Sequence, residues 1–325
     1  MKTITLLFVL FLSLNSLNAR EWKRVKIPGA KCGDGIDYSV FVDQRDSTKL
    51  AVEFMGGGVC WDSYTCYGPN FRTWIHPIPK IPNFSSMTKE DGILSDHTMI
   101  YFPYCTGDIH GGSHVAKYQF GVKVHHTGYS NVEKTWKYLQ KENIIHFKNI
   151  DDLVLYGSSA GAIGSFIHSQ TIKPYLKNGI KKTILADSPG LHFGKKFWNK
   201  FTSRHHKDFK RSFKPIKLDY SMTTGFVAPT LPLVCDTLKD WEIGILQGTQ
   251  DVIMSIVFGN ISPKEHEKLI YRKDGLANVL NDSPNCSAWV AQTKMHTFLI
   301  LPKSAEEIMS DGESAIDFAT RIYHQ

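Results

Sequence analysis

The segment Gly157-Ser158-Ser159-Ala160-Gly161 constrains the fold of this chain more than any other. It follows the apolar run of residues 153–156 and precedes a helical pattern over residues 160–176, so it lies at a turn from a predicted strand to a predicted helix. In this setting a G-x-S-x-G turn lifts its middle serine above the sheet, next to a helix N-terminus that stabilises negative charge. We therefore predict that Ser159 is a nucleophile; the alternative is an ordinary tight turn.

Short apolar runs alternate with helical patterns along most of the chain, which predicts an α/β fold with a mostly parallel sheet flanked by helices. The predicted strands cover residues 50–55, 99–104, 153–156, 183–186 and 243–247, and the predicted helices cover residues 129–142, 160–176 and 305–323. Together with the serine turn, this order predicts the α/β-hydrolase type. We expect residues 20–325 to form one domain, in which residues 192–232 break the alternation and are predicted to be a cap insertion.

The first residues have the pattern of a secretory signal peptide. Lys2 precedes an apolar run over residues 4–14, and small residues follow up to Ala19. The apolar run is shorter than the ~20 residues that a membrane-spanning helix needs. We expect residues 1–19 to be removed, the mature chain to be secreted or periplasmic, and no stable insertion into a membrane.

The chain has six cysteines, an even number that predicts three disulfides in an exported protein. A zinc site is the alternative, but no C-x-x-C pair is present. Spacing alone leaves the pairing open. The cysteines are Cys32, Cys60, Cys66, Cys105, Cys235 and Cys286.

The formal net charge is +7, and much of the excess lies in residues 195–217, where lysine and arginine alternate with aromatic residues. Such a stretch is either a solvated helical face or a surface for an acidic polymer. No nucleic-acid-binding motif accompanies it, so we expect no nucleic-acid partner.

A serine hydroxyl needs a base, and in this fold the partners follow the serine in the order acid, then histidine. Most downstream histidines lie on predicted helices, in the predicted cap or at the chain end: His168, His192, His205, His206, His266 and His324. His296 instead lies on a predicted loop just before the apolar run of residues 298–301. It is the predicted base; the alternative is a buried structural histidine.

Two aspartates compete for the role of the acid. Asp251 follows the predicted strand 243–247 through a short turn, and Asp187 follows the predicted strand 183–186. Both positions lie at the carboxyl end of a strand, where open α/β sheets bind their ligands. Asp251 is the predicted acid that orients His296, and Asp187 is predicted to be a pocket or structural carboxylate.

The glycine-rich run Gly56-Gly57-Gly58-Val59-Cys60-Trp61 follows an early predicted strand. Glycine-rich loops at this place supply backbone amides to the oxyanion in lipases and esterases. A phosphate-binding loop is the alternative, but the lysine and serine or threonine of such a loop do not follow. We predict that the amides of Gly57, Gly58 and Ala160 bind the oxyanion. This chemistry requires neither a metal ion nor an organic cofactor.

The chain resembles the pectin acetylesterase and Notum family of secreted carboxylesterases over most of its mature length. The blocks that carry the resemblance are the glycine-rich run, Pro103-Tyr104-Cys105 with Gly107-Asp108, the serine turn, and the late Gln250-Asp251 and Met295-His296 positions. The resemblance implies a triad of Ser159, Asp251 and His296. It also implies the disulfides Cys60–Cys66, Cys32–Cys105 and Cys235–Cys286.

Two features depart from the family pattern. Val59 and Trp61 flank Cys60 where plant-like members have Gly-Gly-Gly-Trp-Cys, and Ser158 stands where cysteine is common. Both departures lie beside the predicted pocket, in which we also place Asp187, Asp108 and Trp61. His110, His114, His125 and His126 lie between two of the blocks, and their roles stay open between pocket lining on one side and solvent-exposed or structural positions on the other.

The sequence thus predicts a monomeric carboxylesterase that removes acyl groups, with acetyl favoured, from an ester such as an acetylated polysaccharide, acidic polysaccharides included. A lipase, a polyester depolymerase and a protein-lipid deacylase are alternatives that use the same triad, because fold and triad do not determine the leaving group. A carbohydrate-binding protein without catalysis is the alternative from another class.

Overall fold

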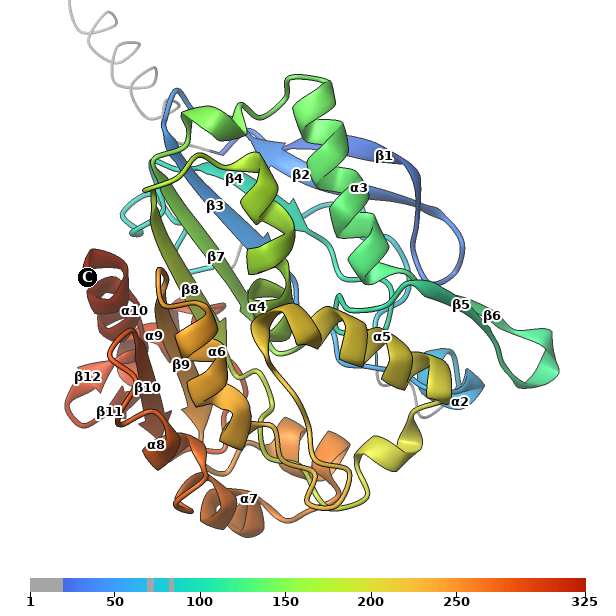
Figure 1. Cartoon of the computed structure of the whole chain (residues 1–325), viewed down its shortest axis with the longest axis vertical. Helices are drawn as coiled ribbons and strands as arrows, with labels where there is room; N and C mark the ends of the chain where they lie inside the picture. The colour runs from blue at the N-terminus through green and yellow to red at the C-terminus, as the bar shows by residue number, and fades with distance from the viewer. Residues whose placement is uncertain (1–19, 69–72, 82–84) are drawn as a thin grey trace, which may run out of the picture.

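The computed structural model describes residues 20–68, 73–81 and 85–325, so the predicted signal peptide, residues 1–19, lies outside the described residues. The centre of the protein is an eight-stranded sheet with the order β1-β2-β4-β3-β7-β8-β9-β10 (Figure 1). The strands are β1 (Lys23–Lys31), β2 (Asp37–Asp43), β3 (Lys49–Phe54), β4 (Thr98–Phe102), β7 (Asp152–Ser158), β8 (Lys181–Asp187), β9 (Glu242–Gly248) and β10 (Cys286–Ala291). From β4 to β10 neighbouring strands are parallel, and β1 and β2 form an antiparallel edge. This arrangement is the predicted α/β-hydrolase type.

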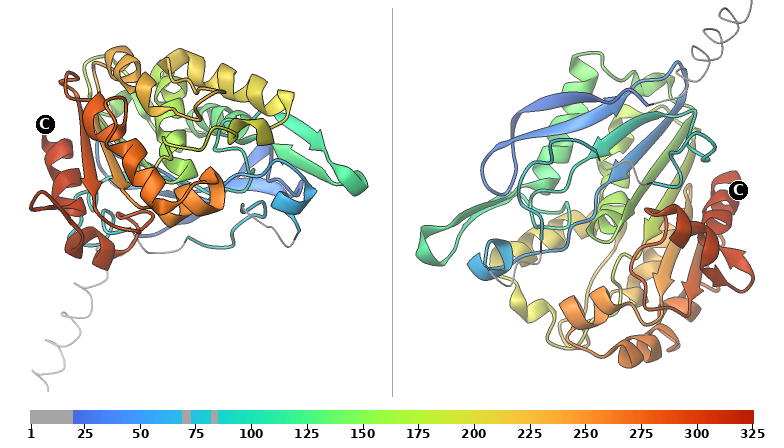
Figure 2. Two further views of the ribbon diagram at one scale, coloured as in Figure 1. Left: turned by 90° about the horizontal axis from the view of Figure 1, so that it is seen from below. Right: turned by 180° about the vertical axis from the view of Figure 1, so that it is seen from behind.

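Each face of the sheet is covered by its own hydrophobic core. Leu153 and Leu155 of β7 pack in the core that also contains side chains of α3 (Gly128–Lys141) and α4 (Ala160–Ile172). Val154 packs on the opposite face, in the core that contains α10 (Ala315–His324). Because successive strand side chains point to opposite faces, a strand covered on both sides needs the continuous apolar run seen in the sequence. Seen from behind, the sheet lies in front of α3 and α4 (Figure 2).

The five predicted strands are β3, β4, β7, β8 and β9, whereas the predicted helix over residues 305–323 is wrong. The chain there forms α9 (Pro302–Glu307), a hairpin of β11 (Met309–Ser310) and β12 (Glu313–Ser314), and then α10. Asp311 and Gly312, with φ angles of 50° and 79°, make the turn of this hairpin. Ser314 then caps α10 by accepting a hydrogen bond from the Asp317 amide.

Residues 192–232 carry short helices and little regular structure otherwise: η4 (Trp198–Lys200), α5 (Ser203–Phe213), η5 (Lys214–Ile216), η6 (Ala228–Thr230) and the beginning of α6 (Leu231–Thr237). Most aromatic side chains of this segment belong to the same hydrophobic core as α4. Its α5 also contacts a hairpin of β5 (His114–Lys117) and β6 (Lys123–His126), through the Arg204 guanidinium, which donates to the Val115 carbonyl (Figure 1).

The remaining α-helices are short and lie in connections between the strands. They are α2 (Ser63–Cys66), α7 (Pro263–Ile270) and α8 (Leu276–Val279), with a π-helical turn over residues 253–259. Within the described ranges no helix is both long and apolar enough to cross a membrane.

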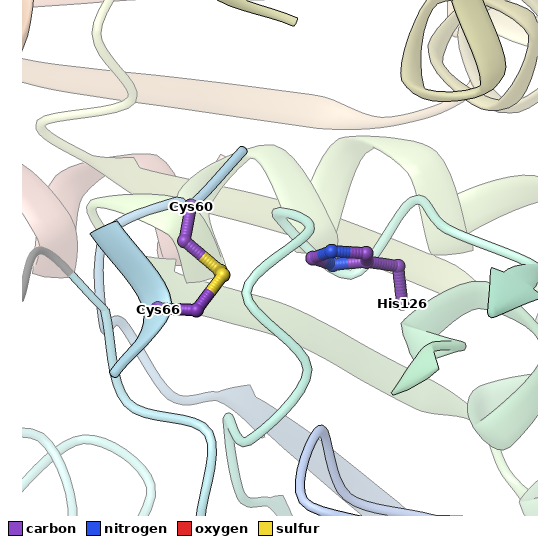
Figure 3. A group of neighbouring side chains, drawn as sticks. All are labelled: Cys60, Cys66 and His126. Carbon is purple, nitrogen blue, oxygen red and sulfur yellow. A yellow bond between two sulfur atoms is a disulfide. The ribbon is translucent and has the colours of Figure 1, made fainter. Parts of the chain in front are cut away.

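All six cysteines are paired, as Cys32–Cys105, Cys60–Cys66 and Cys235–Cys286. These are the pairs that the family resemblance implies. The sulfur atoms of Cys60 and Cys66 lie near the His126 ring, but they are bonded to each other and offer no thiolate to a metal ion (Figure 3). Three disulfides are typical of proteins that fold in an oxidising compartment.

Candidate active site

Ser159 lies at the turn between β7 and α4 with φ 57° and ψ −121°. Residues other than glycine rarely adopt this backbone conformation. The two glycines of the motif are required by close packing. A Cβ atom on Gly157 would lie 2.4 Å from the Gly161 carbonyl oxygen, and one on Gly161 would lie 1.8 Å from the Phe54 carbonyl oxygen. The G-x-S-x-G pattern therefore holds the serine in a sharp turn packed directly against β3.

Ser159 and His296 line one cavity of about 600 Å³ at the carboxyl ends of the strands. His296 comes from the loop after β10, more than a hundred residues later in the chain. Gly56 forms part of the same wall, since a Cβ atom at Gly56 would lie 3.2 Å from the Ser159 Cβ. The structure thus brings the predicted nucleophile, the predicted base and the glycine-rich loop together.

Asp251 is fully buried beyond the end of β9, and its Oδ2 atom lies 2.7 Å from the His296 Nδ1 atom. Its other carboxylate oxygen accepts hydrogen bonds of 2.9 Å from the Ile253 and Met254 amides. The carboxylate is therefore held in place on both sides. With Nδ1 engaged, the imidazole has Nε2 available for proton transfer.

Asp187 contacts the loop of His296 without bonding its ring. One carboxylate oxygen accepts hydrogen bonds from the Phe298 amide at 2.7 Å and the Leu299 amide at 2.9 Å. Burial raises the pKa of the Asp187 carboxyl, and these amide bonds oppose the rise. Between the two aspartates, it is Asp251 that bonds the histidine.

Tyr104 supports the glycine-rich loop and was not singled out as a functional residue from the sequence. Its hydroxyl donates to the Gly58 carbonyl at 2.8 Å and accepts a hydrogen bond from the Ile109 amide at 2.7 Å. Its ring fills the space where a Cβ atom at Gly57 would lie, at 2.3 Å. The only sequence signal for this contact was its place in the Pro103-Tyr104-Cys105 block.

A second, narrow space of about 50 Å³ opens on the other side of Ser159. Gly58, Val59 and Ala160 lie at its Ser159 end, and its walls are almost entirely apolar. We call it the apolar chamber. Six aromatic side chains of residues 192–232 line it: Phe193, Phe197, Trp198, Phe201, Phe209 and Phe213.

The other predicted pocket residues lie outside the sets that line these two spaces. Asp108 is fully buried and accepts a hydrogen bond of 2.7 Å from the Gly128 amide, so it braces the start of α3. Trp61 packs edge-to-face on Phe201 with ring centroids 5.6 Å apart. The contacts of Asp108 and Trp61 support the surrounding loops.

The histidines between the two sequence blocks are likewise structural in their contacts. The His126 ring lies 4.6 Å from the His205 ring of α5 and 5.2 Å from the His114 ring of β5, between centroids. His110 bonds the Met55 carbonyl at 2.9 Å through Nε2. None of His110, His114, His125 and His126 is among the residues that line the cavity or the apolar chamber.

The sheet order, the serine turn and the position of the Asp251–His296 pair define an α/β-hydrolase-type fold with its site at the carboxyl ends of the strands. A family model described as pectinacetylesterase matches residues 18–214. Since this match covers more than half of the chain, the protein belongs to the pectinacetylesterase family. Family membership makes it a carboxylic ester hydrolase or deacylase by class.

Relatives of known function point to the same family. A curated planarian protein, the palmitoleoyl-protein carboxylesterase Notum of Schmidtea mediterranea, is 25% identical over 197 residues, which cover 53% of this chain and 35% of the relative. The match thus spans about a third of that relative's length. Two crystal forms of the Wnt deacylase Notum from Drosophila superpose with TM-scores of 0.63 and 0.62 at 16% identity, covering 94% of this chain and 93% of theirs. At this identity they show the shared fold alone.

Proposed function

We propose that this protein is a serine carboxylesterase with Ser159 as nucleophile, His296 as general base and Asp251 as the orienting acid. The observation that carries the proposal is the 2.7 Å contact between Asp251 and His296 Nδ1, together with the cavity that His296 shares with Ser159. A buried carboxylate on Nδ1 fixes the tautomer and stabilises the imidazolium that forms during the reaction.

The reaction proceeds by two acyl transfers. His296 Nε2 takes the Ser159 proton while the serine oxygen attacks the ester carbonyl carbon. The amides of Gly57, Gly58 and Ala160 stabilise the tetrahedral oxyanion, and the imidazolium returns the proton to the departing alcohol. A water molecule then gives a proton to His296 and attacks the acyl-enzyme, which releases the carboxylic acid and restores Ser159.

The apolar chamber favours an aliphatic acyl group longer than acetyl. Ser159 lines it together with aromatic side chains, and its walls offer almost no polar contact, so each additional methylene that enters gains about 0.8 kcal/mol from burial. Removal of acetyl from a polysaccharide is the second candidate, which the family description supports. The fatty acyl group in the name of the planarian relative supports the first.

The remaining features of the proposal concern location and organisation. We propose that residues 1–19 direct export, in agreement with the three disulfides. Residues 20–325 form one monomeric domain, in which residues 192–232 act as the cap over the acyl group. The acidic-polymer role of the basic stretch within this cap has no further support.

The deciding experiment is hydrolysis of p-nitrophenyl esters from acetate to palmitate by the mature protein and by its Ser159→Ala variant. A maximum at a chain of four or more carbons that disappears in Ser159→Ala is the expected result. A maximum at acetate would favour the deacetylase instead. Full activity in Ser159→Ala would overturn the proposed mechanism.

A further inference from the structure

A single carboxylic acid faces the cavity beside Ser159. Among the described residues that line it, Glu53 is the one acidic side chain, and neither lysine nor arginine is present. Glu53 lies on β3, opposite Tyr156 of β7 in the sheet register. Its neighbour Phe54 points into the core under α4, so Glu53 points to the other face, where the cavity extends away from the apolar chamber.

The Glu53 carboxyl group is only half satisfied by the protein. Its Oε2 atom accepts a hydrogen bond of 2.5 Å from the Tyr156 hydroxyl, and no other bond to this carboxyl occurs within the described part of the chain. The side chain is partly buried, which leaves Oε1 towards the cavity. A site for a ligand group therefore exists beside Oε1.

Within the described part of the chain, no lysine, arginine or histidine forms an ion pair with Glu53. Burial raises the pKa of its carboxyl to about 7, although the Tyr156 hydrogen bond and the more distant charge of Arg20 oppose the rise. Arg20 itself is paired with Asp43 at 2.7 Å. A cation from outside would stabilise the ionised form.

The other groups on this side of the cavity suit an organic cation. Trp74 and Tyr101 line the same space; Trp74 is 40% exposed, whereas Tyr101 is buried and packs edge-to-face on Phe41. Trp74 is therefore the ring open to a cation. Aromatic rings and a carboxylate together are the groups that bind alkylammonium ions, by cation–π attraction and charge. The hydroxyl of Ser85 adds a polar contact without charge.

We propose that the cavity binds a cationic, alkylammonium-bearing alcohol part of the ester, with the Glu53 carboxylate as its counter-ion. This inference rests on the proposed esterase function, since it assigns the acyl group to the apolar chamber and the departing alcohol to the side of Glu53. Glu53 is thus a specificity-determining residue that does not take part in the chemical steps.

The test compares the choline ester and the 3,3-dimethylbutyl ester of one acid, chosen as the best acyl group of the p-nitrophenyl series. The two alcohols have the same shape and differ by one charge. We expect the ratio of kcat/KM for the choline ester over its neutral isostere to be about tenfold at pH 8. In Glu53→Gln it should fall to about one. Glu142→Gln, at an exposed acid beyond α3, should keep the ratio of the parent protein.

The pH dependence of this ratio gives a second measurement. Both esters use Ser159 and His296, so effects of pH on the shared chemical steps cancel in the ratio. The ratio should rise through about pH 7 in the parent protein as Glu53 ionises and stay flat in Glu53→Gln. Tyr156, Tyr101 and Arg20 are the other titratable groups that act on Glu53, and their charges do not change in this range. Should Glu53→Gln not fold, the profile of the parent protein decides.

Two results would overturn the inference: a ratio near one in the parent protein, or an equal ratio in Glu53→Gln. Absence of Ser159-dependent hydrolysis would overturn the proposed function instead. The site can then still be tested by calorimetric binding of benzyltrimethylammonium to the Ser159→Ala protein, with and without Glu53→Gln. Binding that is lost with Glu53→Gln supports the cation site, and binding that is absent or unchanged refutes it.

Discussion

The backbone amide of Ser159 donates a hydrogen bond of 2.7 Å to the carbonyl oxygen of Asp187. The side chain of the same aspartate accepts hydrogen bonds from the amides of Phe298 and Leu299, two and three residues after His296. One residue at the end of β8 thus holds both the turn of the proposed nucleophile and the loop of the proposed base. Asp187 is a positioning residue between them.

Replacement of Ser159 separates chemistry from backbone strain. Ser159→Ala and Ser159→Gly should both lose esterase activity by at least about a thousandfold in kcat, because the attacking oxygen is absent. Ser159→Gly should be the more stable of the two, with a free energy of unfolding about 1 kcal/mol higher than that of Ser159→Ala, because glycine tolerates the positive φ. Ester hydrolysis and urea denaturation measure the two effects. Equal stability of the variants would mean that the turn is not strained.

Asparagine substitutions distinguish the two aspartates. Asp251→Asn should lower kcat about 10³- to 10⁴-fold with little change in KM, because an amide at this site favours the wrong His296 tautomer. Asp187→Asn should act mainly by weakening the bonds to the Phe298 and Leu299 amides, with a lower Tm and a smaller loss of kcat. Steady-state kinetics and thermal unfolding of both variants provide the measurement. A larger kcat loss in Asp187→Asn would reverse the assignment of the acid.

A larger side chain at position 227 should shift the preference of the enzyme towards shorter acyl chains. Val227 is buried and lines the apolar chamber, so Val227→Phe fills space that an acyl chain would occupy. We expect turnover of p-nitrophenyl octanoate to fall at least about tenfold while acetate turnover is largely kept. Val115→Phe on the exposed β5–β6 hairpin is the matched control. An unchanged chain-length profile in Val227→Phe would contradict acyl binding in the chamber.

The elevated pKa of Glu53 makes folding stability depend on pH. In the folded protein this pKa is about 7, against 4.5 as the reference value, so between these values the folded state keeps a proton that the unfolded chain has lost. Stability from this group is therefore full below about pH 4.5 and is lost as pH rises to about 7. Glu53→Gln removes this dependence. The Tm of the variant minus the Tm of the parent protein should therefore increase as the pH rises from 5 to 8. A constant Tm difference would show that the pKa is not raised.

The three disulfides should differ in their contribution to stability. In the chain-entropy model the bridge contributes more when it closes a longer loop, which gives about 4 kcal/mol for Cys32–Cys105 and Cys235–Cys286 and about 2 kcal/mol for Cys60–Cys66. Paired Cys→Ser variants with denaturant unfolding measure this order. Cys60–Cys66 adjoins the glycine-rich loop. Its removal should therefore lower kcat by more than the loss of folded protein alone would explain. An activity loss that only follows stability would argue against a role for this bridge in shaping the loop.

Strand and site positions could be predicted where a local pattern carries the information. The buried parallel strands require continuous apolar runs, and the serine turn requires glycine at two places for packing reasons that hold in any sequence. The Asp251–His296 contact was predictable from the chain order and from the strand end. Local patterns therefore sufficed for the centre of the fold.

Features that depend on contacts between distant segments were not predictable. Glu53 reads as an ordinary residue in a strand, because its exposure to the cavity depends on how β4, β7 and the His296 loop pack around it. The break in the predicted helix over residues 305–323 depends on the turn at Asp311 and Gly312, which the apolar spacing around it obscured. The dual role of Asp187 likewise arises only when β8 meets the loop after β10.

The walls of the apolar chamber have a consequence for how this protein can diverge. Most of its aromatic side chains come from one continuous stretch, residues 193–213, whereas the proposed catalytic groups come from the ends of β7, β9 and β10. Selectivity for the acyl group and the ability to cleave an ester are therefore encoded in separate parts of the gene. Exchange of the segment of residues 193–213 between relatives would change the preferred acyl chain length and leave the residues that cleave the ester unchanged.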